Sequence, residues 1–215
     1  MKFGFLQVYW RYYLTGLGTT IYFSIFTVIF GVILGIALAL MKLSVFKPFK
    51  YFAVSYINFV RGTPILIQIY IVYFGLYVFG INLADNVAGI TALAINSGAY
   101  VAEIVRAGIE AVDKGQIEAA RSLGMSSALT TFKIIIPQAI KNILPALCNE
   151  FIVVTKNTSM LSIIGIHDLM YNTDTIRGNT MLAFEPLIIA ALIYFTMSYV
   201  ISKLVQYLEK RLKTE

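Results

Sequence analysis

The residue with the clearest chemical potential is Glu150, an acid inside a long apolar run. The run from 137 to 155 contains one other charged residue, Lys141 near its start. An acid in the middle of a bilayer costs about 3 kcal/mol to insert, so it normally faces a polar cavity or a partner. Glu150 therefore predicts a site that pairs with a cationic group of a transported molecule. The alternatives are a structural ion pair, for instance with Lys156 or Arg61, or a protonated acid hydrogen-bonded to a neighbouring helix.

Other polar residues are expected at the depth of Glu150. Glu150 lies about 13 residues into its run, which is roughly 20 Å at the helical rise. Asn96 lies about 11 residues, or roughly 16 Å, into the run from 86 to 105. If the two runs cross in opposite directions, these depths differ by about one helical turn. We expect a small polar cavity that binds substrate, and its predicted lining is Glu150, Asn96, Ser97, Asn149 and Thr63.

Enzymatic chemistry finds little support in the sequence. His167 and Asp168 are neighbours, but no recognisable motif places a nucleophile beside them, so we predict no catalytic residue. Cys148 is the single cysteine, and the sequence has no metal-site spacing. The chain also lacks the glycine-rich loop that binds ATP phosphates. We predict no cofactor and no metal, and any energy for transport must come from another protein.

The composition is that of an integral membrane protein. Of the 215 residues, 59% are hydrophobic and 13% are charged, whereas soluble domains average about 25% charged. A membrane span needs about 20 apolar residues. We predict an all-α membrane protein with one domain over residues 1–215 and five transmembrane helices. Their approximate bounds are 14–41, 52–79, 86–105, 137–155 and 184–205.

The second predicted span contains a helix-breaking tetrapeptide, Arg61-Gly62-Thr63-Pro64. Proline lacks an amide hydrogen and disfavours helical geometry in the preceding residue, so the helix should break or kink here. One interpretation places residues 51–60 in an interfacial elbow and starts the true span near Pro64. The depth of Arg61 stays open.

The basic residues predict the orientation of the chain. The net charge of +6 comes from residues that flank apolar runs, which indicates the positive-inside rule and not a nucleic-acid partner. Sorting by side favours an outer N-terminus and a cytoplasmic C-terminus, with Arg61 unassigned. The cytoplasmic group is Lys42, Lys47, Lys50, Arg106, Lys114, Arg121, Lys133, Lys141, Lys203, Lys210, Arg211 and Lys213; the outer group is Lys2, Arg11, Lys156 and Arg177.

Residues 113–136 form a water-facing interruption, which the charge sorting places in the cytoplasm. Glu118 to Arg121 favour helix, and Gly124 can end that helix by adopting a positive φ. Ser126 and Ser127 can cap a second short helix over 127–134, before Pro137 forces a restart. The first helix presents a small, flat alanine surface that a partner protein can approach closely.

This interruption resembles the EAA loop of ABC-importer membrane subunits. The match comprises Glu118-Ala119-Ala120, three residues, Gly124, nine residues, and then Ile134-x-Ile136-Pro137, with Ile136 where leucine is usual. Further runs extend the resemblance to the polar-amino-acid subfamily of type I ABC-importer permeases, which includes histidine, glutamine and arginine transport subunits. These runs are 61–64, 99–109 and 149–159.

The resemblance implies the partners and the machine. It implies a multi-pass permease in a prokaryotic cytoplasmic membrane, paired with a second copy or a homologue. Two ABC ATPase subunits, which bind the ATP, would dock on the two loops, and an extracytoplasmic substrate-binding protein would deliver an amino acid. The expected coupling contacts are Glu118, Ala119, Ala120, Leu123 and Gly124.

Glu150 directs the cargo prediction to basic amino acids such as arginine, histidine or lysine, because an anion in a low dielectric favours a cation. Glutamine or another neutral polar amino acid is the alternative, since a carboxylate also accepts hydrogen bonds from an α-ammonium or an amide. A competing class is an ion-coupled carrier in which Glu150 relays protons, although five spans show no sign of an inverted repeat. A second competing class is a scaffold or membrane enzyme without transport activity.

Overall fold

The computed structural model describes residues 3–213, and their side chains as far as residue 207. Lys2 and the side chains of Lys210, Arg211 and Lys213, which entered the charge sorting, lie outside this part. Every regular element within it is helical. In order they are α1 (Leu6–Leu43), α2 (Lys47–Gly62), α3 (Ile65–Tyr70), the π-helical turn η1 (Ile71–Gly75), α4 (Leu76–Val78), α5 (Asp85–Glu110), α6 (Lys114–Ser122), α7 (Ser127–Thr130), the π-helical turn η2 (Thr131–Ile135), α8 (Ile136–Asn157), the 3₁₀ helix η3 (Thr158–Ile164), α9 (Leu169–Thr180) and α10 (Glu185–Lys213).

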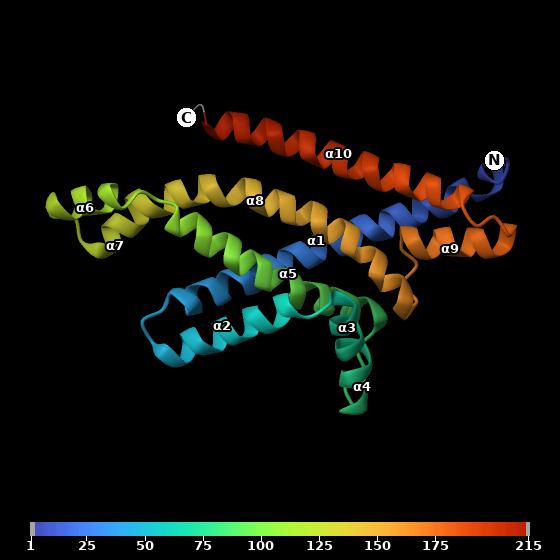
Figure 1. The fold of residues 1–215 in the computed structure, drawn as a ribbon, viewed down its shortest axis with the longest axis horizontal. Coiled ribbons are helices and arrows are strands. Elements are labelled where there is room, and N and C mark those ends of the chain that lie inside the picture. Colours follow the sequence, from blue (N-terminus) through green and yellow to red (C-terminus); the bar gives the residue numbers. More distant parts are fainter. Residues whose placement is uncertain (1–2, 214–215) are drawn as a thin grey trace.

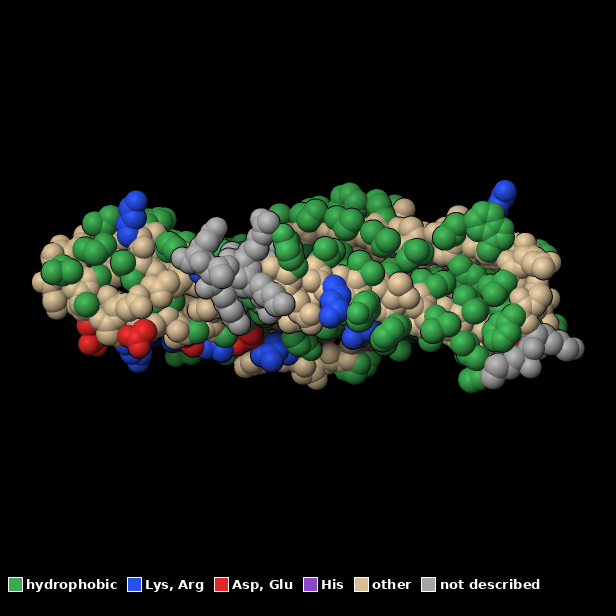
Figure 2. Space-filling view, turned by 90° about the horizontal axis from the view of Figure 1, so that it is seen from above, with side chains coloured by type: hydrophobic (Ala, Val, Ile, Leu, Met, Phe, Trp, Pro, Cys, Tyr) green, Lys and Arg blue, Asp and Glu red, His purple; other side chains and the backbone are tan. Residues whose placement is uncertain are grey.

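The molecule is an elongated bundle in which α1, α5, α8 and α10 run along the long axis (Figure 1). The short helices α6 and α7 lie at one end, and α9 lies at the other end near the N-terminus. Hydrophobic side chains cover much of the middle of the face in Figure 2, while its acidic side chains gather mainly in the half that holds α6 and α7. This distribution matches a chain that crosses a lipid layer and projects a polar end beyond it.

Three described helices are long and apolar enough to cross a membrane: α1, α5 and α10 as far as Tyr207. The bent pair of Lys47–Gly62 and Ile65–Val78 raises the number to four if each pair is one span. Helix α8 has 22 residues but does not count among these helices, because polar residues such as Asn142, Asn149 and Glu150 lower its hydropathy. Five spans therefore stay a prediction.

Close packing of α1 on α5 depends on two glycines of α1. Gly31 and Gly35 are both buried. A Cβ at Gly35 would lie 2.5 Å from Cγ1 of Val101, and a Cβ at Gly31 would lie 3.0 Å from Oγ of Ser97. Only glycine lets the two backbones approach so closely. Gly31 thereby leaves room for the side chain of Ser97, one of the predicted site residues.

The predicted break at Pro64 is present. Helix α2 ends at Gly62, α3 begins at Ile65, and the two segments are bent by 111°. The interpretation of residues 51–60 as an interfacial elbow is wrong. Figure 1 shows α2 running alongside α1, and Ala53 and Ile57 are fully buried in the core that α1, α2 and α5 share. The segment that turns aside is α3 to α4.

The loop between α5 and α8 folds largely as its local residues predict. Asp113 caps α6 by accepting from the Gln116 amide, and Ser126 caps α7 by accepting from the Leu129 amide. Gly124 has φ of +81°, which is the left-handed conformation that a glycine adopts without strain.

The predicted restart at Pro137 is wrong, because the chain stays helical from α7 through η2 into α8. The backbone of Ile135 and Ile136 is α-helical. Proline needs extra room and leaves one carbonyl without its usual amide donor. The π-helical turn η2, which ends two residues before Pro137, widens the helix locally and accommodates the ring.

Candidate functional site

Two hydrogen-bonded groups of buried polar side chains meet at consecutive residues of α5. Ser97 donates from Oγ to Oε1 of Glu150 on α8 across 2.9 Å. Asn96 donates from Nδ2 to Oε1 of Gln68 on α3, also across 2.9 Å. Consecutive side chains on a helix point about 100° apart. Ser97 of α5 therefore faces α8, while Asn96 of α5 faces α3. The two groups together are called the buried polar group below: Thr63, Gln68, Asn96, Ser97 and Glu150.

Glu150 is buried, with 8% of its surface exposed, and Ser97 is the one side chain described as donating to it. The structure does not support the proposed ion pairs. The Arg61 guanidinium lies over the ring of Tyr100, 5.4 Å from its centroid. Among the described residues, Lys156 is exposed and enters no salt bridge. Glu150 is thus a buried acid that no described basic side chain neutralises. Its bond to Ser97 of α5 agrees with the alternative of an acid hydrogen-bonded to a neighbouring helix.

Gln68 is a site residue that the sequence analysis missed. It is 6% exposed and donates from Nε2 to the Val60 carbonyl at 2.7 Å, to the Thr63 carbonyl at 3.1 Å and to the Thr63 hydroxyl at 2.8 Å. The break at Pro64 leaves the last carbonyls of α2 without helical donors, and Gln68 supplies them. The signal was available, since Gln68 is the one polar residue among Ile65–Tyr70 before the tyrosine.

The predicted lining residues are only partly brought together. Asn96 and Ser97 are buried beside one another, and Ser97 reaches Glu150 directly. Thr63 joins them through Gln68. Asn149 is exposed, and no hydrogen bond among the described residues ties its side chain to this group. It precedes Glu150 by one residue and so faces about 100° away.

The five expected coupling residues lie mostly on the surface. Glu118, Ala119, Leu123 and Gly124 are exposed, whereas Ala120 is 5% exposed and faces inward. Leu123 projects furthest, with 84% of its surface exposed. The Met125 amide donates to the Ala120 carbonyl at 3.1 Å, so the turn at Gly124 folds back over α6. Leu123 is thus an exposed apolar side chain between two helices, each of which has a side-chain cap at its N-terminus.

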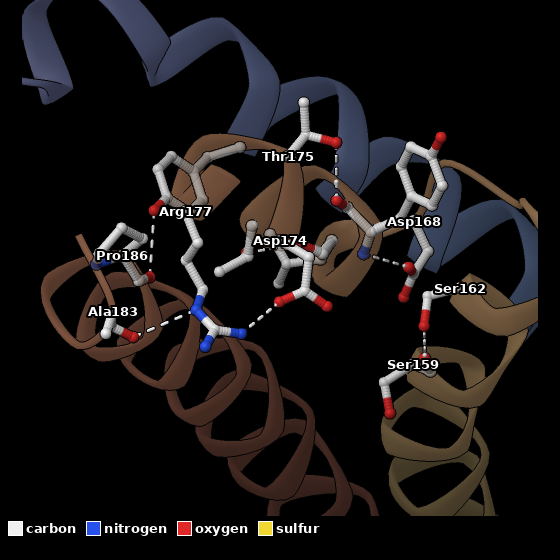
Figure 3. A network of polar contacts seen from close by, with 12 residues as sticks. Ser159, Ser162, Asp168, Asp174, Thr175, Arg177, Ala183 and Pro186 are labelled. Atoms are coloured by element: carbon white, nitrogen blue, oxygen red, sulfur yellow. Dashed lines mark hydrogen bonds and ion pairs between the residues drawn. The ribbon is translucent and has the colours of Figure 1, made fainter. Parts of the chain in front are cut away.

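Helix α9 holds together the end of the bundle near the N-terminus (Figure 1), and its polar residues make contacts within the chain. Asp168 is fully buried, caps α9 by accepting from the Tyr171 amide at 2.9 Å, and accepts from the Tyr194 hydroxyl at 3.3 Å. Burial raises the pKa of the Asp168 carboxyl to about 6. Figure 3 shows Arg177 pointing to Asp174 on one side, at 2.6 Å, and to the Ala183 carbonyl on the other, at 3.1 Å.

His167 takes no part in a catalytic arrangement with Asp168. Its ring stacks on Tyr171, with centroids 4.1 Å apart. The described residues contain no group of three or more His, Cys, Asp or Glu side chains that could hold a metal ion. The predicted site residues lie mainly in two regions, the buried polar group and the loop 113–136.

Comparison with known proteins identifies the family. The model of the binding-protein-dependent transport system inner membrane component matches residues 31–214. The probable glutamine ABC transporter permease protein GlnM of Bacillus subtilis (strain 168) is 40% identical over 201 residues, covering 94% of this chain and 93% of that protein. The arginine transport system permease protein ArtQ of the same organism is 42% identical over 202 residues, covering 94% and 92%.

Solved structures agree with this assignment. A crystal structure of an amino acid ABC transporter with histidines is 51% identical, with a TM-score of 0.93, and the match covers 98% of this chain and 100% of that one. An inward-facing MetNI methionine ABC transporter is 16% identical with a TM-score of 0.80 over 99% of both chains, which shows the shared fold. The chain belongs to the binding-protein-dependent transport system inner membrane components and is a permease subunit of an amino acid ABC transporter.

Proposed function

We propose that this permease imports basic amino acids, such as arginine, histidine or lysine, and that Glu150 binds their cationic group. The observation that carries the proposal is the burial of Glu150 with a hydroxyl as its described partner and no described basic side chain to neutralise it. A buried carboxylate strongly favours a positive charge at short range. The hydroxyl of Ser97 donates to Oε1 of Glu150 and leaves Oε2 without a described donor.

The mechanism follows from the two regions. Five spans, with the N-terminus outside and the C-terminus in the cytoplasm, place Glu150 at mid-membrane and the loop 113–136 in the cytoplasm. Two ATPase subunits dock on the loops of this chain and of a second permease copy or homologue, where Leu123 and the exposed face of α6 form the contact. A substrate-binding protein delivers the amino acid outside. Closure of the ATPases shifts α6 and tilts the attached helices, so the site opens to each side in turn.

A neutral polar amino acid is the second candidate, and a specific observation favours it. The relatives include permeases named for glutamine as well as one named for arginine. A carboxylate at Glu150 also accepts hydrogen bonds from an α-ammonium or from the side-chain amide of glutamine. The two candidates differ in how much charge they require at Glu150.

An ATPase assay of the reconstituted transporter, titrated with single amino acids, separates the candidates. We expect arginine to stimulate the wild type at the lowest concentration. Glu150→Gln should raise the half-maximal arginine concentration about tenfold or more, since a hydrogen bond to a charged group is worth about 1.5–3 kcal/mol, and should affect glutamine less. Glu110→Gln, which changes an exposed acid paired with Arg106, is the matched control. Equal stimulation of wild type and Glu150→Gln by basic amino acids would disprove this role for Glu150.

A further inference from the structure

The orientation of the Gln68 side-chain amide is fixed by atoms that can only accept hydrogen bonds. Its Nε2 lies 2.7 Å from the carbonyl oxygen of Val60 and 3.1 Å from that of Thr63. A carbonyl oxygen has no hydrogen to donate, so the nitrogen of Gln68 must face these two atoms. The oxygen of Gln68 must then face the other way, towards Asn96 on α5. The carbonyls at the broken end of α2 thus determine that the oxygen of the Gln68 amide faces α5.

The orientation of Asn96 follows from that of Gln68. Because Oε1 of Gln68 accepts only, Asn96 must present its own Nδ2, and the two atoms are 2.9 Å apart. Asn96 therefore keeps Oδ1 and the second hydrogen of Nδ2 uncommitted, and no described hydrogen bond reaches that oxygen. In the described part of the chain, Oγ1 of Thr27 is the one fully buried side-chain polar atom without a hydrogen-bond partner. Oδ1 of Asn96 consequently retains accessible surface, one residue along α5 from Ser97.

The hydroxyl hydrogens of Ser97 and Thr63 are committed. Ser97 donates its hydroxyl hydrogen to Glu150, and Thr63 donates its own to the Phe59 carbonyl at 3.0 Å. The same accessibility argument applies to Oε2 of Glu150, which has no described donor. Oδ1 of Asn96 and Oε2 of Glu150 are therefore the acceptor atoms left to meet a ligand, beside the second hydrogen of Asn96 Nδ2. A ligand that supplies several hydrogens, such as a guanidinium or an ammonium, matches these two oxygens.

We propose that Gln68 is a specificity-determining residue that acts through Asn96. By holding the Asn96 amide in one of its two orientations, Gln68 keeps Oδ1 of Asn96 as an acceptor for a ligand and selects donor-rich cations over amino acids whose side chains also need a donor, such as glutamine. This inference rests on the proposed function. Without Gln68, the Asn96 amide is free to turn and to present Nδ2 to a neutral side chain.

The test measures the ratio of the half-maximal glutamine concentration to the half-maximal arginine concentration in the ATPase assay of the reconstituted transporter. Gln68→Met keeps the length and the unbranched shape of the side chain but removes both halves of the amide. We expect it to lower the ratio about tenfold, mainly by improving the response to glutamine. Gln68→Leu is the second variant if Gln68→Met does not assemble. Gln138→Leu is the matched control, because the Gln138 amide also joins two segments, donating to Gln116 at 2.6 Å and to the Ile134 carbonyl at 3.0 Å. It should leave the ratio unchanged, whatever it does to the rate.

A double-mutant cycle tests whether Gln68 acts through Asn96. In the Asn96→Ala background, Gln68→Met should not change the ratio further. A ratio that Gln68→Met leaves at the wild-type value, or changes equally in both backgrounds, would overturn the inference and reduce Gln68 to a cap of α2. Glu150→Gln tests the proposed function separately. If Glu150→Gln leaves the half-maximal arginine concentration unchanged, the proposed function has failed. If Glu150→Gln raises that concentration but Gln68→Met leaves the ratio unchanged, only the inference about Gln68 has failed.

Discussion

The loop 113–136 and the buried polar group are built by opposite rules. In the loop, each cap joins residues three apart: Asp113 with Gln116 and Ser126 with Leu129. In the buried polar group, Gln68 and Asn96 are 28 residues apart, and Ser97 and Glu150 are 53 apart. The loop keeps its shape from local chemistry even where its surface is open, whereas the polar group exists only because α3, α5 and α8 pack together.

The difference fits two different tasks. A loop that docks a partner, as proposed, must present the same surface throughout the cycle. Short-range caps and a left-handed glycine hold its turns, and Gln138 of α8 donates to Gln116 at 2.6 Å. A substrate site that opens to each side in turn must respond to helix movements, and hydrogen bonds between separate helices change with them. The substitutions below act on the packing at Gly35, on a local bond at Ser126, and on both kinds of contact at Asp168.

The largest effect is expected from Gly35→Val, which acts on the packing. A Cβ at this position would lie 2.5 Å from Cγ1 of Val101 and 2.9 Å from the Gly98 carbonyl, so α1 and α5 must move apart. Overpacking of this kind costs about 3 kcal/mol. We expect a clear loss of thermal stability in detergent, with the ATPase response to arginine weakened because α5 carries Asn96 and Ser97.

Gly18→Val is the matched control for Gly35→Val. Gly18 lies on the same helix, is exposed, and has no atom within 4 Å of an added Cβ. It should change the unfolding temperature little. If both valines cost the same stability, the close approach of α1 and α5 contributes little, and the contrast between packed and local regions would be lost.

The next effect, about 2–3 kcal/mol, is a dependence of stability on pH that Asp168 introduces at the N-terminal end of α9. Asp168 combines a local cap, from the Tyr171 amide, with a distant bond from Tyr194. Its pKa rises from 3.8 to about 6 on folding because the carboxyl is buried. The folded state then binds the proton more tightly than the unfolded state. The stabilisation is complete below pH 3.8 and is lost as the pH rises through 6.

Asp168→Asn tests that dependence, because asparagine also caps a helix but does not titrate. Unfolding temperatures of wild type and variant should be compared between pH 4.5 and 7.5. The wild type should lose stability relative to Asp168→Asn as the pH rises, by about 1.4 kcal/mol for each unit of pKa shift. Parallel curves would mean that the carboxyl is solvated in the folded protein.

The features of the fold that could be predicted from the sequence are those that depend on a few neighbouring residues. The positive φ of Gly124, the cap at Ser126 and the break at Pro64 were all expected, since each depends on one or two neighbouring residues. The restart at Pro137 was wrong because the π-helical turn before it depends on how the helix shares strain over several residues. The elbow at 51–60 was wrong because only packing against α1 determines which side of a break turns away.

The same limit applies to the site. The depth of a polar residue along a run can be counted, and this placed Glu150, Asn96 and Ser97 at one level. The facing of a residue depends on its helix neighbours, so Asn149 was grouped with a residue that points elsewhere. Gln68 was missed because it donates to the carbonyls of Val60 and Thr63, which the break at Pro64 leaves without helical donors. The three-dimensional bend between α2 and α3 brings Gln68 within reach of these carbonyls.

The smallest expected effect is that of Ser126→Ala, which acts only on a local bond. Ser126 accepts from the Leu129 amide at 3.3 Å, and loss of such a cap costs about 1 kcal/mol. Hydrogen exchange at Leu129 should quicken about fivefold, while the response of the ATPase to arginine keeps its half-maximal concentration. Ser127→Ala is the matched control, because the Ser127 hydroxyl makes no described cap bond. A shift in the half-maximal arginine concentration with Ser126→Ala would mean that the loop communicates with the buried polar group at rest, and that the two regions are not built independently.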